Sequence, residues 1–270
     1  MTTGKTIGFI GGGNMAEAII KGLLAGAVKP DNIMVAEPMA TRRDFLVSEY
    51  SVKVSDDNLE VARKANILVL AIKPQMASSV LSDLEQAIST DVLIISIMAG
   101  ISTAFIEEAL MKSVRVVRAM PNTPALIQTA ATAICSGRKA TSSDLNAARE
   151  IFSRCGTVVV VPEKQMDAVT GLSGSGPAYV FTFIEALSDA GVKNGLPRDV
   201  ATELAIQTVM GSARMLAETG EHPAVMKEKV TSPGGTTIAG LHALETGCFR
   251  GVVMNAVDAA TNRSKELAGK

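Results

Sequence analysis

Aromatic side chains and net charge are what this sequence has least of. Its 270 residues include no tryptophan and only two tyrosines, and the formal net charge at pH 7 is -1. A near-neutral chain lacks the basic surface that binds a phosphate backbone, and it offers few rings on which bases could stack. We therefore expect no nucleic-acid partner.

Cysteine and histidine are scarce as well. The three cysteines, Cys135, Cys155 and Cys248, are odd in number, widely spaced and set in apolar surroundings. We interpret them as buried thiols of a cytoplasmic protein and not as a disulfide framework. Since His222 and His242 are the only histidines and lie far apart, the sequence predicts no zinc or other metal site.

Long apolar runs are also missing. No stretch reaches the length that crosses a bilayer, and the short polar start, Met1–Lys5, does not resemble a signal peptide. We expect no membrane partner. Hydrophobic residues nevertheless make up 47% of the chain, which is enough for a substantial core in one large domain or two smaller ones.

The first half alternates short β-rich runs with helix-length amphipathic stretches. The runs are Thr6–Ile10, Ile33–Ala36, Ile67–Ala71, Val92–Ser96, Val114–Met120, Thr132–Ser136 and Thr157–Val161. This alternation, with nearly continuous apolar strands, predicts an α/β Rossmann-type domain with a mostly parallel sheet over residues 1–163. The direction of the strands from Thr132 onward stays open.

The pattern changes after Pro162, and residues 164–270 show helices only. The helical stretches are 175–192, 197–218, 223–229, 236–245 and 249–267. Apolar residues between Ala178 and Leu187 cover more than one helix face, which is typical of a helix buried on several sides. We expect an all-α dimerisation domain that packs against a second subunit; a single-chain bundle is the alternative.

A glycine-rich turn stands at the start of the first domain. The strand Thr6–Ile10 is followed by a G-x-G-x-x-A pattern at Gly11, Gly13 and Ala16 and by a helix from Asn14. The first glycine permits a tight turn, the second lets the backbone approach a pyrophosphate, and the alanine keeps helix and strand close. The pattern predicts a dinucleotide site.

Charges near the second strand do not decide between NADH and NADPH. Glu37 ends that strand and has the position of the acid that binds a ribose 2′-hydroxyl, which favours NADH. Arg42 and Arg43 follow and could neutralise a 2′-phosphate, which favours NADPH. A solvated helix face explains the two arginines equally well.

A second glycine-rich turn lies late in the chain, in Val230–Ile238. Paired glycines allow a close backbone approach, and a turn that opens a helix directs free N–H groups at an anion. The hydroxyls of Ser232, Thr236 and Thr237 add uncharged donors. Two such turns predict a cofactor pocket and a separate pocket for a small acid.

Five segments carry a resemblance to a known family: Gly-Phe-Ile-Gly-Gly-Gly-Asn-Met-Ala (8–16), Ala-Ile-Lys-Pro-Gln (71–75), Met-Pro-Asn-Thr-Pro (120–124), Gly-Leu-Ser-Gly-Ser-Gly-Pro-Ala-Tyr (171–179) and Val-Thr-Ser-Pro-Gly-Gly-Thr-Thr (230–237). In this order they resemble the pyrroline-5-carboxylate reductases. The similarity runs from residue 5 to residue 267. It implies reduction of 1-pyrroline-5-carboxylate to L-proline with NADP(H), or with NAD(H), by a Rossmann domain and a helical dimerisation domain. It also implies dimers, which often assemble into a larger ring.

The resemblance implies particular site residues. Those expected at the cofactor are Ile10, Gly11, Gly12, Gly13, Asn14, Met15, Glu37, Asn58, Ala71, Ile72, Lys73, Pro74, Ile97, Met98 and Ala99. Those expected at the substrate are Ser232, Gly234, Gly235, Thr236 and Thr237, with Thr237 as the catalytic threonine. Lys229 lies near the substrate position of relatives and Glu221 one place from a family acidic residue, and neither has an assigned role. For the run 171–179, packing is favoured over ligand contact, and Ser175 is the residue of that run expected to touch a ligand.

The chemistry of a cyclic imine agrees with this set. A protonated imine is already electrophilic, so the protein must position the ring, exclude water and hydrogen-bond the nitrogen. We assign the substrate carboxylate to the amides of Gly234–Thr236 and the nitrogen to the hydroxyl of Thr237.

Two rival functions remain open. A β-hydroxyacid dehydrogenase needs a lysine to move the alcohol proton, and 175–183 contains none. A non-enzymatic NAD(P)H sensor would not need the second turn.

Overall fold

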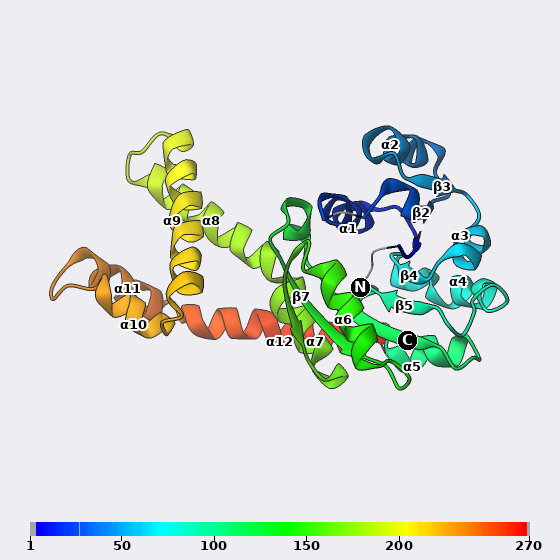
Figure 1. Cartoon of the computed structure of the whole chain (residues 1–270). Coiled ribbons are helices and arrows are strands. Elements are labelled where there is room, and N and C mark those ends of the chain that lie inside the picture. The colour runs from blue at the N-terminus through cyan, green and yellow to red at the C-terminus, as the bar shows by residue number, and fades with distance from the viewer. Residues whose placement is uncertain (1–3, 27, 269–270) are drawn as a thin grey trace. The chain divides into compact units, whose positions relative to one another are not determined.

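The structure is a computed structural model that describes residues 4–26 and 28–268. It divides into two compact units, one formed by Met1–Ser175 with Ala259–Lys270 and the other by Gly176–Asp258. Figure 1 shows the first as a sheet with helices and the second as helices only.

The first unit is built on an eight-stranded sheet with strand order β3-β2-β1-β4-β5-β6-β7-β8. The strands are β1 (Ile7–Ile10), β2 (Ile33–Ala36), β3 (Lys53–Ser55), β4 (Ile67–Leu70), β5 (Leu93–Ser96), β6 (Arg115–Met120), β7 (Ala130–Ser136) and β8 (Gly156–Val160). Neighbours from β3 to β6 pair in parallel, β6 and β7 pair antiparallel, and β7 and β8 pair in parallel with each other. The predicted Rossmann-type sheet is confirmed, and the last two strands run against the rest.

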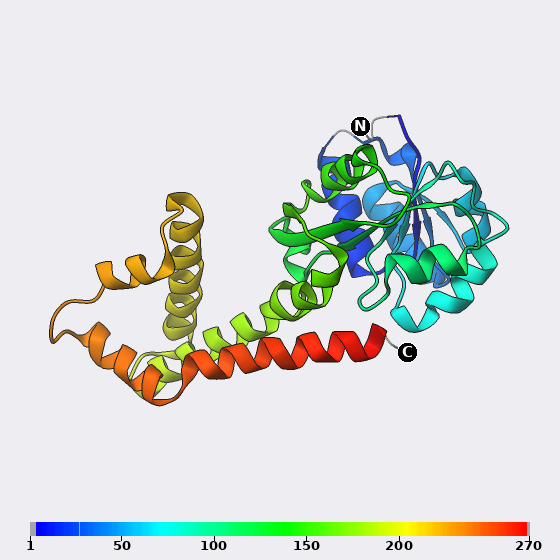
Figure 2. The same ribbon diagram turned by 90° about the horizontal axis from the view of Figure 1, so that it is seen from below.

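Helices cover both faces of the sheet (Figure 2). The elements between the strands are α1 (Asn14–Ala25), η1 (Pro30–Asn32), α2 (Ala40–Tyr50), α3 (Asn58–Lys64), η2 (Pro74–Met76), α4 (Ala77–Leu84), α5 (Thr103–Ala109), η3 (Thr123–Ile127) and α6 (Ser142–Phe152). The side chains of Ile7 and Phe9 pack with α1, α2 and α6, whereas Ile10 packs with α3, α4 and α5. Because strand side chains alternate, one strand fills two cores.

One strand was not predicted from the sequence. β3 contains only three residues, Lys53-Val54-Ser55, and lies at the edge of the sheet beside β2. A short edge strand buries little and therefore shows no apolar run in the sequence. The prediction of the other strands from their apolar runs is confirmed to within a few residues.

After β8 the described chain contains no further strand. The helical elements are η4 (Glu163–Gln165), α7 (Met166–Val169), the π-helical turn η5 (Thr170–Gly174), α8 (Gly176–Lys193), α9 (Arg198–Thr219), α10 (Pro223–Lys229), α11 (Thr236–Thr246) and α12 (Phe249–Ala268). This confirms the predicted all-α segment. Helical structure already begins at η4, before the expected start at Ser175.

Large apolar side chains of the second unit are exposed on this chain. Phe181 of α8 is 64% exposed, Leu204 and Met210 of α9 are 54% and 55% exposed, and Met254 of α12 is 66% exposed. Apolar patches of this kind mark protein interfaces. The exposure fits the expectation that these helices meet a second subunit.

The three cysteines differ in environment. Cys135 and Cys155 are buried, whereas Cys248, between α11 and α12, is exposed, so the expectation of burial is wrong for it. Burial, and then the negative charge of Glu163, raise the pKa of Cys135 to about 12, and burial raises the pKa of Cys155 to about 11.

We expect iodoacetamide to leave Cys135 and Cys155 unmodified in the folded protein at about pH 8, because only the thiolate reacts and both thiols stay protonated. Mass spectrometry should find both modified after denaturation. As pH rises from roughly 8.5 to about 11, the unfolded chain releases thiol protons that the folded chain keeps, so the free energy of unfolding should fall. Rapid native alkylation of either thiol would contradict this.

Candidate functional site

The carboxyl ends of β1, β2, β4 and β5 lie at one edge of the sheet. Ile10 is in register with Ala36 and with Leu70, and Leu70 is in register with Ser96. The strand order reverses at β1, which has β2 on one side and β4 on the other. Open α/β sheets bind ligands outside such a reversal point.

The residues predicted for the cofactor gather at this edge. Glycine-rich loop 10–15 follows β1, Glu37 follows β2, and segments 71–74 and 97–99 follow β4 and β5. Asn58 begins α3, three residues after β3 ends. The N-cap of α3 is Asp57, whose side chain accepts a hydrogen bond from the Leu59 amide at 2.8 Å, so Asn58 does not cap the helix.

Gly11 has a backbone that a side chain would disrupt. Its φ is +96°, and a Cβ there would lie 2.6 Å from the carbonyl oxygen of Ala71. Its amide donates to the carbonyl of Ala36 at 2.8 Å. The loop after β1 is therefore wedged between the ends of β2 and β4, which only glycine allows.

Gly13 differs because its surroundings are open. It is the N-cap of α1 and offers no side chain to the helix amides, and a Cβ there would meet nothing within 4 Å. The first amides of α1 therefore face space that the fold does not fill. A helix start of this kind binds anions through its N–H groups and dipole.

A cavity of 380 Å³ continues from this helix start. It is lined by Gly13, Asn14, Glu37, Met39, Thr41, Arg42 and Phe45. The Glu37 carboxylate accepts hydrogen bonds from the amides of Gly12 at 2.9 Å and Met39 at 3.0 Å, so it is fixed at the rim. The cavity carries one carboxylate that could receive a hydroxyl and one guanidinium that could face a phosphate.

A second cavity, of 260 Å³, lies at the ends of β4 and β5. It is lined by Pro74, Gln75, Ser78, Ala99, Gly100, Ile101, Ser102, Phe105 and Leu267. Pro74 and Ala99 were predicted for the cofactor. Met98, by contrast, is 1% exposed with its side chain in the core, so it can offer only backbone to a ligand.

Asn122, which follows β6, uses its side-chain amide to connect η5 with β7. It is 8% exposed, its side-chain N–H donates to the carbonyl of Ser173 at 3.0 Å, and its side-chain oxygen accepts from the Ala131 amide at 2.9 Å. This side chain therefore ties the π-helical turn η5 to the sheet.

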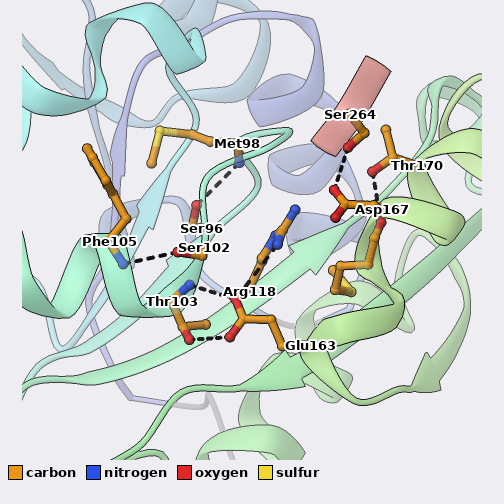
Figure 3. Close-up of polar contacts among 11 residues, drawn as sticks. Ser96, Met98, Ser102, Thr103, Phe105, Arg118, Glu163, Asp167, Thr170 and Ser264 are labelled. Atoms are coloured by element: carbon orange, nitrogen blue, oxygen red, sulfur yellow. Dashed lines mark hydrogen bonds and ion pairs between the residues drawn. The ribbon is translucent and has the colours of Figure 1, made fainter. Parts of the chain in front are cut away.

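A buried polar cluster was missed by sequence reasoning (Figure 3). Arg118, only 4% exposed on β6, lies 3.7 Å from the carboxylate of Glu163. That carboxylate accepts hydrogen bonds from the amide and the hydroxyl of Thr103, at 2.7 and 2.6 Å. Beside it, the Ser264 hydroxyl donates to Asp167 at 2.7 Å. The one signal in the sequence is Arg118 in the middle of β6, between the apolar residues Val117 and Ala119.

The cluster holds the chain that leads out of the sheet. Glu163 caps the start of α5 although the two lie 60 residues apart in sequence. Charge-assisted hydrogen bonds of this kind are among the stronger polar contacts in proteins. Together with Asn122, they fix the segment from η4 to η5.

The second glycine-rich turn lies in the other compact unit. Gly234 has a φ of +65°, and Gly235 is the N-cap of α11 without a side-chain cap. The carbonyl of Gly235 accepts the first helical hydrogen bond, from the amide of Ala239 at 3.4 Å. The amides of Thr236 and Thr237 open the helix, so the prediction that the turn leads into a helix is confirmed. Thr237 is half-buried, and Ser232 and Thr236 are exposed.

Lys229 and Glu221 form an ion pair just before this turn. The lysine ammonium group donates to both carboxylate oxygens, at 2.5 and 2.6 Å. Each partner therefore satisfies the other on this chain.

Within residues 4–26 and 28–268, no helix is long and apolar enough to cross a membrane. The same residues contain no group of three or more His, Cys, Asp and Glu side chains placed to hold a metal ion.

Comparisons with known proteins cover the chain nearly end to end. A family model described as pyrroline-5-carboxylate reductase dimerisation matches residues 163–267, and one described as NADP oxidoreductase coenzyme F420-dependent matches residues 6–100. The pyrroline-5-carboxylate reductase of Methanosarcina acetivorans is 50% identical over 98% of this chain and 99% of the relative.

Solved structures agree with the sequence relatives. A pyrroline-5-carboxylate reductase from Coxiella burnetii superposes with a TM-score of 0.92 at 40% identity over 98% of both chains. Plasmodium falciparum pyrroline carboxylate reductase with NADP bound superposes with a TM-score of 0.89 at 36% identity, again over 98% of both chains. The similarity spans both compact units.

Replacing Gly13 by alanine should separate binding from folding. The new methyl group meets no protein atom within 4 Å, so we expect the free energy of unfolding to change by less than about 1 kcal/mol. The methyl would stand where a pyrophosphate approaches the backbone, so NADPH affinity should fall at least about tenfold.

The matched variant is Gly11→Ala, which should destabilise the fold because of its positive φ and the contact with Ala71. Calorimetry for binding and thermal melting for stability distinguish the two. A Gly13→Ala protein that binds NADPH as tightly as the wild type would show that the loop does not hold the cofactor.

Proposed function

The chain belongs to the pyrroline-5-carboxylate reductase family, and from that premise we propose that it reduces 1-pyrroline-5-carboxylate to L-proline, as the last step of proline biosynthesis. It is an oxidoreductase that acts on a C=N bond with NADP(H), and NAD(H) is the alternative donor. The proposal rests above all on full-length similarity that includes two glycine-rich turns, each opening a helix.

The cofactor site that we propose follows the carboxyl edge of the sheet. Amides of 11–15 receive the pyrophosphate, and Glu37 with Asn58 lies toward the adenosine half. Segments 71–74 and 97–99 lie toward the nicotinamide half. The open space at Gly13 and the cavity beside Glu37 support this assignment. When bound, the reduced nicotinamide supplies the hydride.

The substrate site that we propose is the turn before α11. Amides of Gly234, Gly235 and Thr236, with the hydroxyl of Ser232, hold the carboxylate of the imine. The Thr237 hydroxyl hydrogen-bonds the ring nitrogen and keeps the C=N carbon in one orientation. The Gly235 amide already donates to the carbonyl of Ser232 at 3.1 Å, so the first assignment is supported by the amides of the α11 start, which no side chain caps. The partial burial of Thr237 supports the second. No base is needed in this direction, because hydride adds to the C=N carbon of the protonated imine and the nitrogen keeps its proton.

A β-hydroxyacid dehydrogenase is disfavoured by the composition of α8. Its first lysine is Lys193, at the very end of the helix, far from the first turns where an alcohol-oxidising enzyme needs one. A sensor that only binds NAD(P)H would have no use for the second anion turn.

We further propose that residues 1–163 and 164–270 act as the cofactor domain and the dimerisation domain, and that dimers assemble into a ring. The match of the dimerisation model to residues 163–267 supports the boundary. Free thiols at Cys135, Cys155 and Cys248 support a cytoplasmic location.

Replacing Thr237 by alanine should lower kcat for imine reduction about 10- to 100-fold, the effect of losing one hydrogen bond to a charged group. NADPH affinity, measured by fluorescence titration, should change less than about twofold, since the threonine belongs to the substrate site. Thr237→Ser keeps the hydroxyl and should recover most of the activity. An alanine variant with wild-type kinetics would remove Thr237 from the mechanism.

Light scattering should give a mass of at least two chains. The reason is the exposed apolar surface of α8, α9 and α12, which costs free energy in water unless a second subunit covers it. An even multiple above two would support the ring of dimers. A stable monomer at micromolar concentration would contradict the assembly.

A further inference from the structure

Arg42, the guanidinium on the cavity beside Glu37, is already paired within the protein. Its Nη2 donates to Glu17 at 2.5 Å, and its Nε donates to the carbonyl of Gly12 at 2.6 Å. Its guanidinium also lies 4.9 Å above the ring of Phe45. The cation is therefore held against the glycine-rich loop and beside a negative charge.

Glu17, in the first turn of α1, is fixed from two sides. One carboxylate oxygen accepts from Arg42, and the other accepts from the Tyr50 hydroxyl at 2.8 Å. Burial by itself raises the pKa of Glu17, but hydrogen bonds from Arg42 and Tyr50 and the charges of Arg42 and Lys21 outweigh it and lower that pKa. Burial and the hydrogen bond to Glu17 raise the pKa of Tyr50 to about 12, so its hydroxyl remains a donor.

The second arginine does not replace Arg42 at the cavity. One nitrogen of Arg43 donates to the carbonyls of Glu37 and Pro38, both at 2.8 Å, and Arg43 is not among the residues that line the cavity. Glu37, in contrast, presents a carboxylate at the rim. The cavity is thus bordered by one carboxylate and by an ion pair whose charges cancel.

This arrangement bears on the choice between the two dinucleotides, which differ by a 2′-phosphate. We propose that Glu17 is a specificity-determining residue: by neutralising Arg42 it restrains binding of the 2′-phosphate and sets the ratio of NADPH to NADH use. The inference rests on the cofactor site of the proposed function. It assigns a role to Glu17, which belongs neither to the glycine pattern at 11–16 nor to the expected ribose-binding position at Glu37.

The size of the effect follows from Coulomb's law. A unit charge removed within roughly one Debye length, about 8 Å, of a doubly charged phosphate changes the affinity by about tenfold after solvent screening. The 5′-phosphate, which 2′,5′-ADP and 5′-AMP share, responds to the same change in both ligands, so the ratio of the two affinities isolates the effect at the 2′-phosphate.

The test compares two nucleotide fragments, 2′,5′-ADP and 5′-AMP, by isothermal titration calorimetry. In Glu17→Gln we expect the affinity for 2′,5′-ADP to rise about tenfold more than the affinity for 5′-AMP. Glu17→Ala should give the same direction, and alanine is compatible with the helix. The ratio of kcat/KM for NADPH to that for NADH should rise by a similar factor.

A double variant examines the ion pair itself. Glu17→Gln combined with Arg42→Ala removes one negative and one positive charge, so the net charge beside the cavity is unchanged. The ratio of the affinity for 2′,5′-ADP to that for 5′-AMP should therefore return to within about threefold of the wild-type value. The control is Glu108→Gln. Glu108 lies on α5, away from the cavity, and this change removes its 3.3 Å ion pair with Arg138. It should change neither affinity.

The outcomes separate this inference from the proposed function. If wild-type protein binds neither fragment, the cofactor site itself is misplaced and the inference falls with it. If both fragments bind but the ratio is unchanged or lower in both Glu17 variants, only the role of Glu17 is overturned. A gain that persists in the double variant also overturns it, because Arg42 would then not be the group released. Thermal melting confirms that each variant is folded.

Discussion

The close passage of the Gly11 backbone against the carbonyl of Ala71 is the constraint on which the cofactor edge depends. The loop after β1 can reach the start of α1 only by taking a positive φ at this point, with its amide bonded to β2 and its Cα pressed against the end of β4. This geometry turns the first amides of α1 outward, over the reversal point of the sheet. Once the loop is fixed, Glu37 can hold the Gly12 amide and Arg42 can hold the Gly12 carbonyl.

Away from that edge, polar side chains fix the position of the helical segment from η4 to η5. Asn122 and Glu163 anchor the chain as it leaves β8 through hydrogen bonds with Ser173 and Thr103, and Arg118 forms an ion pair with Glu163. Buried polar groups are costly unless they are satisfied, so these contacts favour one arrangement over many similar ones. The segment that precedes α8 is therefore defined within the first compact unit, before the second unit begins.

Local signals in the sequence were sufficient for most of the fold. Buried parallel strands such as β1 and β4 are apolar throughout, and glycine and proline mark the ends of the later helices, so both were predicted closely. β3 was missed because a three-residue edge strand buries almost nothing. The prediction for Cys248 was wrong because its apolar neighbours, such as Phe249 and Val252, are themselves exposed on this chain.

The site was predicted only where a motif carries it. Glycine patterns announce both turns, because a backbone conformation is a local property. The pairing of Glu17 with Arg42, 25 residues apart, and of Thr103 with Glu163, 60 residues apart, depends on how the chain folds back. No periodicity in the sequence encodes such pairs. The sequence alone therefore predicted that Arg42 could bind a phosphate and gave no sign of its pairing with Glu17.

Both proposed anion sites share one electrostatic feature, which bears on turnover. At each, the cation that the sequence placed nearby is occupied by an acid: Arg42 by Glu17, and Lys229 by Glu221. The anion then depends on backbone amides at a helix start, which bind less tightly than a free cation would. In the substrate site that we propose, the amides would hold the carboxylates of imine and proline alike, so they would contribute uniform binding that does not lower the barrier. Discrimination between substrate and product must then arise where the two differ, at the ring nitrogen that we assign to Thr237.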